Sequence, residues 1–75
     1  MSKIPAVKPK KLFQILKKEG FYIHHQKGSH LVLKSKIDEK LRVTLPFHNK
    51  DLKRKTIISI LKQANLDISV LKKNN

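Results

Sequence analysis

The sequence predicts a small α+β domain in the chain order helix, strand, strand, strand, helix, with a three-stranded antiparallel sheet. Two changes of hydrophobic period indicate this class: apolar residues repeat at helical spacing before Gly20, alternate from Phe21 to Leu45, and return to helical spacing near Arg54. Length is the third observation, because 75 residues fit one domain that buries only about 60% of its unfolded surface. Any site on such a domain is expected to be shallow.

The first element is a predicted helix over Pro9 to Glu19. Its apolar residues fall on one side at helical spacing and most of its lysines on the other. The apolar positions are Leu12, Phe13, Ile15 and Leu16. Pro9 suits a first helical turn and Gly20 suits the stop. Residues 1–8 and 72–75 have no consistent period, so we expect a single domain over residues 1–75 with loose ends.

The first predicted strand covers Phe21 to Gln26, where the period falls to two. Regular alternation places two sets of residues on opposite faces: Phe21, Ile23 and His25 on one, and Tyr22, His24 and Gln26 on the other. Lys27 and Gly28 then supply a hairpin turn.

Two more strands complete a predicted antiparallel meander. The second covers Ser29 to Ser35, with Leu31 and Leu33 on one face and with His30, Val32 and Lys34 on the other. A polar, turn-like segment follows over residues 36–40. The third strand alternates Leu41, Val43 and Leu45 with Arg42 and Thr44 until Pro46 ends it.

The second predicted helix begins near Arg54, after a loop over residues 47–53. Its apolar stripe has helical spacing and consists of Ile57, Ile60, Leu61 and Ala64. Asn65 is an acceptable left-handed stop, and Asp67 is a candidate cap for a last short turn. Packing both helices on one face of the sheet buries these stripes economically and leaves the other face open to water or a ligand.

The charge balance narrows the possible partners. Eighteen Lys and Arg against five Asp and Glu give a formal net charge of +13, which exceeds what solubility requires and attracts polyanions. Nucleic acid is the leading partner, with an anionic membrane surface or a merely solvated basic face as alternatives. There is no cysteine and no apolar run that resembles a signal peptide or a membrane span. We therefore expect a cytoplasmic protein without disulfides, resident metal or cofactor.

His30 is the leading candidate for chemistry. If Leu31 and Leu33 face the helices, His30 faces outward beside Lys27 and Lys34. Histidine is the side chain whose unperturbed pKa lies near neutrality. A neutral imidazole takes the proton from a ribose 2′-hydroxyl, which then attacks the adjacent phosphorus, while Lys or Arg stabilises the phosphate charge. This chemistry needs no metal and is specific to RNA.

Several segments in order resemble the HicA family of bacterial toxin ribonucleases. They are LKKEGFYIHHQKGSHLVL, then VTLPFH at the end of the third strand, then KTIISILKQANL near the end. The resemblance extends from about Leu12 to Leu71. It implies a fold similar to the double-stranded RNA-binding domain, cleavage of mRNA that depends on His30, and neutralisation by a HicB-like antitoxin of a type II toxin–antitoxin system. Many relatives carry a second histidine where this chain has Leu31, so position 31 is not expected to be essential.

Other residues are candidate RNA contacts. Lys27, Gly28, Ser29 and Lys34 surround His30, and a basic run at the start of the last helix favours phosphate. That run is Lys53, Arg54 and Lys55. His48 is either a second acid or phosphate donor, or a loop histidine without a role. His24 and His25 are expected to point to opposite faces, so both cannot line one site, and surface or interface positions are the simpler interpretation.

Two classes of function remain open. The first is an RNA-cleaving toxin, which requires His30, RNA and a protein antitoxin. The second is a non-catalytic double-stranded RNA-binding module, which requires only the basic surface. A DNA-binding regulator is disfavoured, because the last helix offers mostly Ile, Leu and Lys rather than base-reading side chains.

Overall fold

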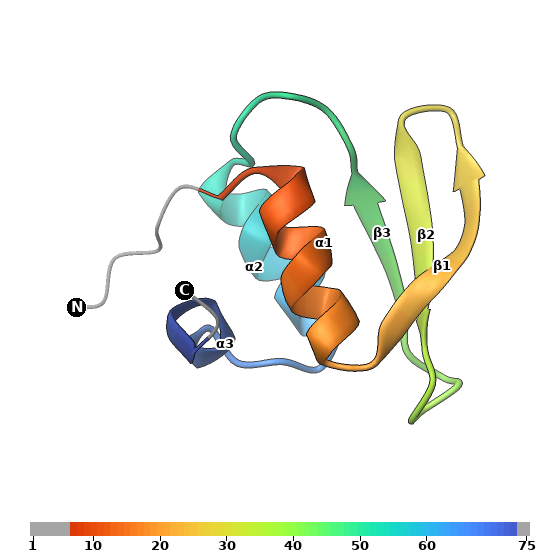
Figure 1. The fold of residues 1–75 in the computed structure, drawn as a ribbon. Coiled ribbons are helices and arrows are strands. Elements are labelled where there is room, and N and C mark those ends of the chain that lie inside the picture. Colours follow the sequence, from red (N-terminus) through yellow and green to blue (C-terminus); the bar gives the residue numbers. More distant parts are fainter. Residues whose placement is uncertain (1–6, 74–75) are drawn as a thin grey trace.

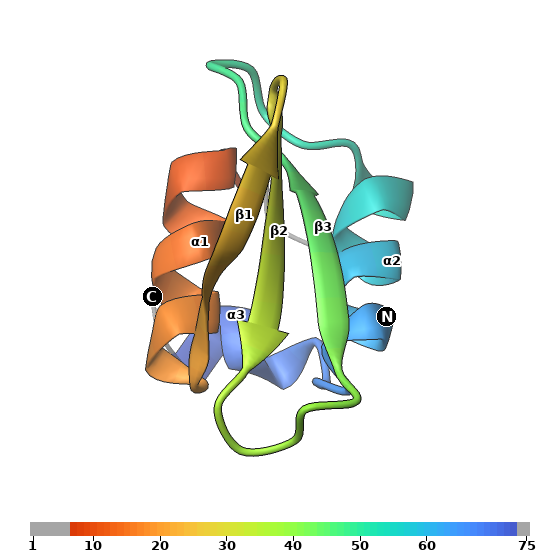
Figure 2. The same cartoon turned by 90° about the vertical axis from the view of Figure 1, so that its right-hand side faces the viewer.

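A computed structural model describes residues 7–73 of the chain. The elements are α1 (Pro9–Lys18), β1 (Phe21–Lys27), β2 (His30–Ser35), β3 (Arg42–Pro46), α2 (Arg54–Gln63) and α3 (Ser69–Lys73). The strands form one antiparallel sheet in the order β1-β2-β3. The helices lie on one face of it, and no helix of residues 7–73 covers the other face, which we call the uncovered face (Figures 1 and 2). The predicted α+β class, element order and placement of the helices are confirmed.

The core lies between α1, α2 and the helix-facing side of the sheet. Its fully buried side chains alternate along β2 and β3 and repeat at helical spacing along α1 and α2, as the two hydrophobic periods predict. They include Leu12, Ile15, Leu16, Leu33, Val43, Leu45, Ile57 and Ile60. Because β2 is central and its Leu31 and Leu33 are buried, the face that carries His30 is fixed by the packing of its neighbours.

Backbone conformation matches two of the predicted stops. Gly20 has φ +94° after α1 and Asn65 has φ +56° after α2, both in the left-handed region. The carboxylate of Asp67 accepts a hydrogen bond from the Ser69 N–H at 3.2 Å, which caps α3. Hydrogen bonds from the Ser69 hydroxyl, the Ser69 N–H and the Ile68 N–H hold the pKa of Asp67 below its usual value.

The predicted loose ends are shorter than expected where the structure describes them. Val7 is 6% exposed and its carbonyl oxygen accepts a hydrogen bond from the Leu52 N–H at 2.8 Å, so it belongs to the core. At the other end, α3 extends through Lys73. The remaining residues of the predicted loose ends, 1–6 and 74–75, lie outside the described part of the chain.

Strand β1 departs from regular alternation. Tyr22 pairs with Lys34 and Ile23 with Leu33, but the next pair is His25 with Val32, so the register shifts by one residue between Ile23 and His25. His24 is the extra residue of a β-bulge. The prediction that His25 shares a face with Phe21 and Ile23 is therefore wrong.

The same shift moves Gln26, which pairs with Leu31 instead of sharing the face of Tyr22. From His25 onward, residues predicted for one face of the sheet lie on the other.

The outer edge of β3 is partly covered by α2. The Thr44 N–H donates to the side-chain oxygen of Gln63 at 3.1 Å, which satisfies an edge group of the sheet. The side-chain amide of Gln63 in turn contacts the Ser59 hydroxyl at 3.3 Å.

None of the helices in the described residues is long and apolar enough to cross a membrane.

Candidate functional site

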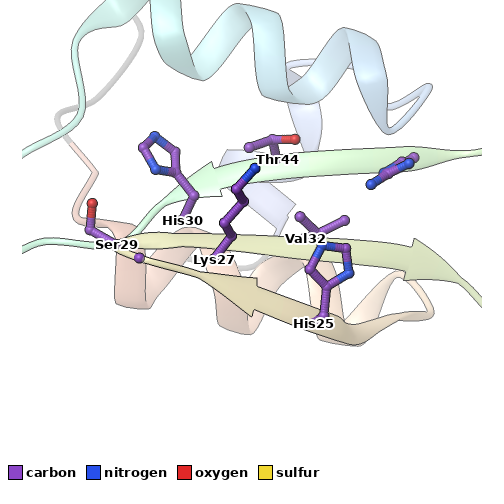
Figure 3. A pocket seen from close by; sticks show the side chains of 8 residues that line it. His25, Lys27, Ser29, His30, Val32 and Thr44 are labelled. Carbon is purple, nitrogen blue, oxygen red and sulfur yellow. The ribbon is translucent and has the colours of Figure 1, made fainter.

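A hollow of about 570 Å³ lies on the uncovered face of the sheet and extends from the β1-β2 hairpin along the strands to Arg42. All three strands contribute to its lining (Figure 3). The lining residues are His25, Lys27, Gly28, Ser29, His30, Val32, Arg42 and Thr44. We call this depression the sheet hollow. Its size and open form agree with the shallow site expected for so short a chain.

The hairpin turn fixes the position of His30. Gly28 has φ +59°, in the left-handed region, and a Cβ there would meet no atom within 4 Å. Glycine is therefore favoured at this position by the backbone conformation and not by a close neighbouring atom. His30 then begins β2, opposite Lys27 on β1 and Pro46 on β3. The carbonyl oxygen of Ser29 accepts a hydrogen bond from the Phe47 N–H at 2.7 Å, which ties the turn to the segment after β3. The His30 side chain is exposed, as predicted.

Two cationic side chains reach the sheet hollow from opposite edges of the sheet. Lys27 comes from the end of β1 and Arg42 from the start of β3. Val32 lies between these strands on β2 and is only 6% exposed although no helix covers this face. The sheet hollow therefore has an apolar floor, two permanent positive charges and two imidazoles, which is a combination suited to a phosphodiester and its sugar.

His24 and His25 contact each other instead of pointing to opposite faces. Their Nδ1 atoms are 2.8 Å apart and their rings meet edge to face, with centroids 5.0 Å apart. The bulge brings the two adjacent side chains to one side of the strand, so the prediction of opposite faces is wrong. Of the two, His25 lines the sheet hollow and His24 does not.

The environment of His24 disfavours its charged form. Partial desolvation is the largest cause, and the positive charges of Lys34, His25 and Arg42 add to it, so the pKa of His24 lies below its ordinary value of 6.5. These charges come from all three strands, which shows how the positive groups converge on the uncovered face.

The sheet hollow contains some of the predicted site residues and not others. Lys27, Gly28, Ser29 and His30 line it, whereas Lys34 lies farther along β2, opposite Arg42 and Tyr22. His48 is exposed in the loop after β3, where its Nδ1 accepts a hydrogen bond from the Lys50 N–H at 3.2 Å. Neither Lys34 nor His48 is among the lining residues.

The predicted basic run lies at the start of α2. Lys53, Arg54 and Lys55 are exposed and do not line the sheet hollow. Lys53 is the N-cap residue without a side-chain cap, and no acidic residue occupies the first turn. The helix start thus has unpaired N–H groups beside three cations, an arrangement that favours an anion. A role of this run in RNA binding stays a prediction.

Four lining residues were missed by reasoning from the sequence: His25, Val32, Arg42 and Thr44. Alternation along β3 did place Arg42 and Thr44 on the face opposite the core, so the sequence could have shown that they lie on the uncovered face. Their positions opposite Lys34 and Val32 depend on the register between β2 and β3. His25 was hidden by the bulge.

Among residues 7–73, no group of three or more His, Cys, Asp or Glu side chains is placed to hold a metal ion.

The chain matches the model of a known protein family. Residues 9–66 match the model of the HicA toxin of bacterial toxin–antitoxin systems, which covers most of the chain. The chain belongs to the HicA toxin family. It is therefore the toxin type of a toxin–antitoxin system, and membership of the HicA family implies an antitoxin partner. The matched region includes the whole sheet hollow and ends before α3. A search of curated proteins returned no match.

Proposed function

We propose that this HicA-family toxin is a metal-independent endoribonuclease that binds and cleaves mRNA, with His30 as the general base. The observation that carries the proposal is the position of His30. It is exposed at the start of β2, in a hollow that also contains Lys27 and Arg42. A structural histidine would more usually be bonded within the core, and none of the described hydrogen bonds ties the His30 ring.

Each group has a defined task in this proposal. The neutral imidazole of His30 accepts the 2′-hydroxyl proton, and the 2′-oxygen attacks the adjacent phosphorus. Lys27 and Arg42 stabilise the charge that develops on the nonbridging oxygens of the phosphate. Val32 provides an apolar surface against which a sugar or base packs. Proton transfer and charge stabilisation are both supplied by side chains, so a chelator should not abolish cleavage.

The test compares His30→Ala with wild type in RNA cleavage and in growth arrest after expression in bacteria. We expect a loss of about 10²–10⁴-fold in cleavage, the usual contribution of a general base, and no growth arrest. Because His30 is exposed, the melting temperature should stay nearly unchanged. Gln14→Ala is the control, since Gln14 is exposed on α1 in the opposite layer of the molecule.

Two results would count against the proposal. A folded His30→Ala protein that cleaves RNA at the wild-type rate would remove His30 from the reaction. A wild-type protein that binds RNA but neither cleaves it nor arrests growth would indicate the alternative function, a non-catalytic double-stranded RNA-binding module. The large positive charge outside the sheet hollow, including Lys53, Arg54 and Lys55, is compatible with that alternative.

We also propose that the antitoxin is an acidic, HicB-like protein that covers His30 and the cations around it. None of the described residues forms a lid over this shallow site, so control is expected to come from a protein that occludes or distorts it. Asp and Glu side chains of such a partner would associate rapidly with a chain of net charge +13 and would stabilise it by mass action. Co-expression with the neighbouring reading frame should relieve toxicity and yield a complex in which RNA no longer reaches His30. Failure to co-purify would contradict this proposal.

A further inference from the structure

The sheet hollow contains a second histidine, to which the proposed mechanism assigns no task. His25 enters it because the bulge at His24 shifts the register of β1. Figure 3 shows the His25 and His30 side chains on the same face of the sheet, with Lys27 and Val32 in the same hollow. One hollow thus holds two imidazoles and two permanent cations, the latter being Lys27 and Arg42.

The register fixes the relative positions of His25 and His30 in the sheet. His25 pairs with Val32 and Lys27 pairs with His30, so His25 and His30 are diagonal neighbours across the β1-β2 ladder. Diagonal positions on one face lie about 7–8 Å apart. Long side chains on residues at that backbone spacing can reach different oxygens of a single phosphodiester placed between them, each at hydrogen-bond length, roughly 2.6–3.2 Å. One imidazole serves the attacking oxygen and the other the leaving oxygen.

His24 defines which nitrogen of His25 is available. The two Nδ1 atoms are 2.8 Å apart, so one ring donates there and the other accepts. Desolvation first, and then Lys34, His25 and Arg42, keep the pKa of His24 low, which favours a neutral His24 as the acceptor. A His25 that donates from Nδ1 leaves Nε2 for the substrate, and the imidazolium form carries a proton on each nitrogen.

We infer that His25 is the general acid of the RNA cleavage, paired with His30 as the general base. This role rests on the proposed RNA cleavage, so the experiment must separate the two. His30 takes the 2′-hydroxyl proton, and the 2′-oxygen forms a bond to phosphorus. The bond from phosphorus to the 5′-oxygen breaks, its electron pair stays on that oxygen, and His25 supplies the proton. The products are a 2′,3′-cyclic phosphate and a 5′-hydroxyl end, with His30 protonated and His25 neutral, and water exchanges the protons afterwards.

The test uses two RNA substrates with the full chain. The cleavage site is first mapped on an ordinary oligonucleotide, and a second oligonucleotide then carries sulfur in place of the 5′ bridging oxygen at that site. A thiolate is a weaker base than an alkoxide and leaves without a proton, so it bypasses a general acid. Wild type, His25→Ala, His30→Ala and Gln14→Ala are assayed on both substrates, and each fold is checked by circular dichroism. His25 is exposed, so its replacement should not unfold the domain.

Distinct outcomes are expected for each variant. His25→Ala should lose about 10²–10⁴-fold on ordinary RNA and return to within a few fold of wild type on the sulfur substrate. His30→Ala should lose on both, and Gln14→Ala on neither. The pH profile of kcat/KM should be bell-shaped for wild type and should lose its alkaline limb in His25→Ala. The charged and titratable groups that face the pair are His24 and Lys27 on β1, His30 and Lys34 on β2 and Arg42 on β3.

Three results overturn the inference. Full activity of His25→Ala on ordinary RNA would show that no acid acts from this position. Equal losses on both substrates would show that His25 serves binding or shape instead of protonation. A wild type that cleaves neither RNA would overturn the proposed function and this inference together, whereas the first two results would leave the role of His30 intact.

Discussion

Replacing the two cations of the sheet hollow should weaken RNA binding mainly at low salt. Lys27 pairs with His30 and Arg42 with Lys34, and both line the sheet hollow, so an RNA strand that follows it from His30 meets each cation in turn. Each phosphate neutralised on a single strand contributes about 0.7 to the slope of log K against log salt concentration. Loss of two contacts should therefore reduce the slope by about 1.4. The protein that keeps both cations should bind RNA more tightly than the doubly substituted protein, and the ratio of their affinities should fall about sevenfold as salt rises from about 50 to 200 mM.

The assay is fluorescence anisotropy with labelled RNA over a series of salt concentrations. All proteins carry His30→Ala so that the RNA stays intact. Lys27→Gln with Arg42→Gln is compared with a control that removes the same charge elsewhere, Lys10→Gln with Lys11→Gln on the exposed side of α1. The control should change the slope little, because Lys10 and Lys11 are exposed on α1 and this helix lies on the face of the sheet opposite to the sheet hollow (Figure 1). Equal slopes for the two double variants would refute the assignment of these cations to phosphate.

The basic run at the start of α2 makes a third arm of the same experiment. If Lys53, Arg54 and Lys55 each contact a phosphate, their joint replacement by Gln should reduce the slope by about 2.1. All three are exposed and lie outside the sheet hollow, so contacts from them would require an RNA that extends beyond it. A change in slope no larger than the control would limit the RNA footprint to the sheet hollow.

Two further predictions concern stability. Leu33 is fully buried on the central strand, so Leu33→Ala should lower the free energy of unfolding by about 2–5 kcal/mol in urea titrations. A domain of this length has a total free energy of unfolding of about 4–11 kcal/mol. The control is Ile37→Ala, at a side chain that is 84% exposed, which should change the free energy of unfolding by less than about 0.5 kcal/mol. The lowered pKa of His24 in the fold means that the unfolded chain binds more protons, so its contribution to stability is present above its ordinary pKa of 6.5 and is lost as pH falls through the lower folded value. The melting temperature should therefore fall on acidification below about pH 6.5, and this fall should be smaller in His24→Gln; an unchanged pH dependence in that variant would contradict the assignment.

Much of the fold follows from the spacing of apolar residues. A half-buried strand must alternate and a helix packed on a sheet must carry one apolar stripe, so the positions of Leu31, Leu33 and Val43 along the chain are enough to define the two faces of the sheet. The stops at Gly20 and Asn65 were predictable for a local reason, since both residues tolerate the left-handed conformation they adopt. The outward position of His30 follows from the burial of Leu31 beside it.

The composition of the sheet hollow was less predictable, because it depends on register between strands. Arg42 and Thr44 were placed on the correct face by alternation. Arg42 lies beside Lys34 and Thr44 beside Val32 because of the residue at which β3 begins after the connecting segment over residues 36–40. The amino-acid composition of that segment does not determine where β3 begins. If β3 shifted by two residues relative to β2, Val43 and Leu45 would still point into the core. The hydrophobic pattern alone is therefore compatible with several arrangements of the side chains on the uncovered face.

The bulge shows how one extra residue decides which side chains meet. Ile23 and His25 pair with Leu33 and Val32, which are consecutive, so β1 without His24 would alternate regularly and would still present His25 on the uncovered face. His24 is thus inserted between two regular halves of the strand. Its insertion costs a ladder position and brings its own ring against His25, at 2.8 Å between the Nδ1 atoms. If His24 instead occupied a regular ladder position and the strand had no bulge, His25 would lie opposite Leu31 on the core side, away from His30. With the bulge, the same residue lies across the ladder from His30, where a proton donor is what the leaving oxygen of a phosphodiester requires.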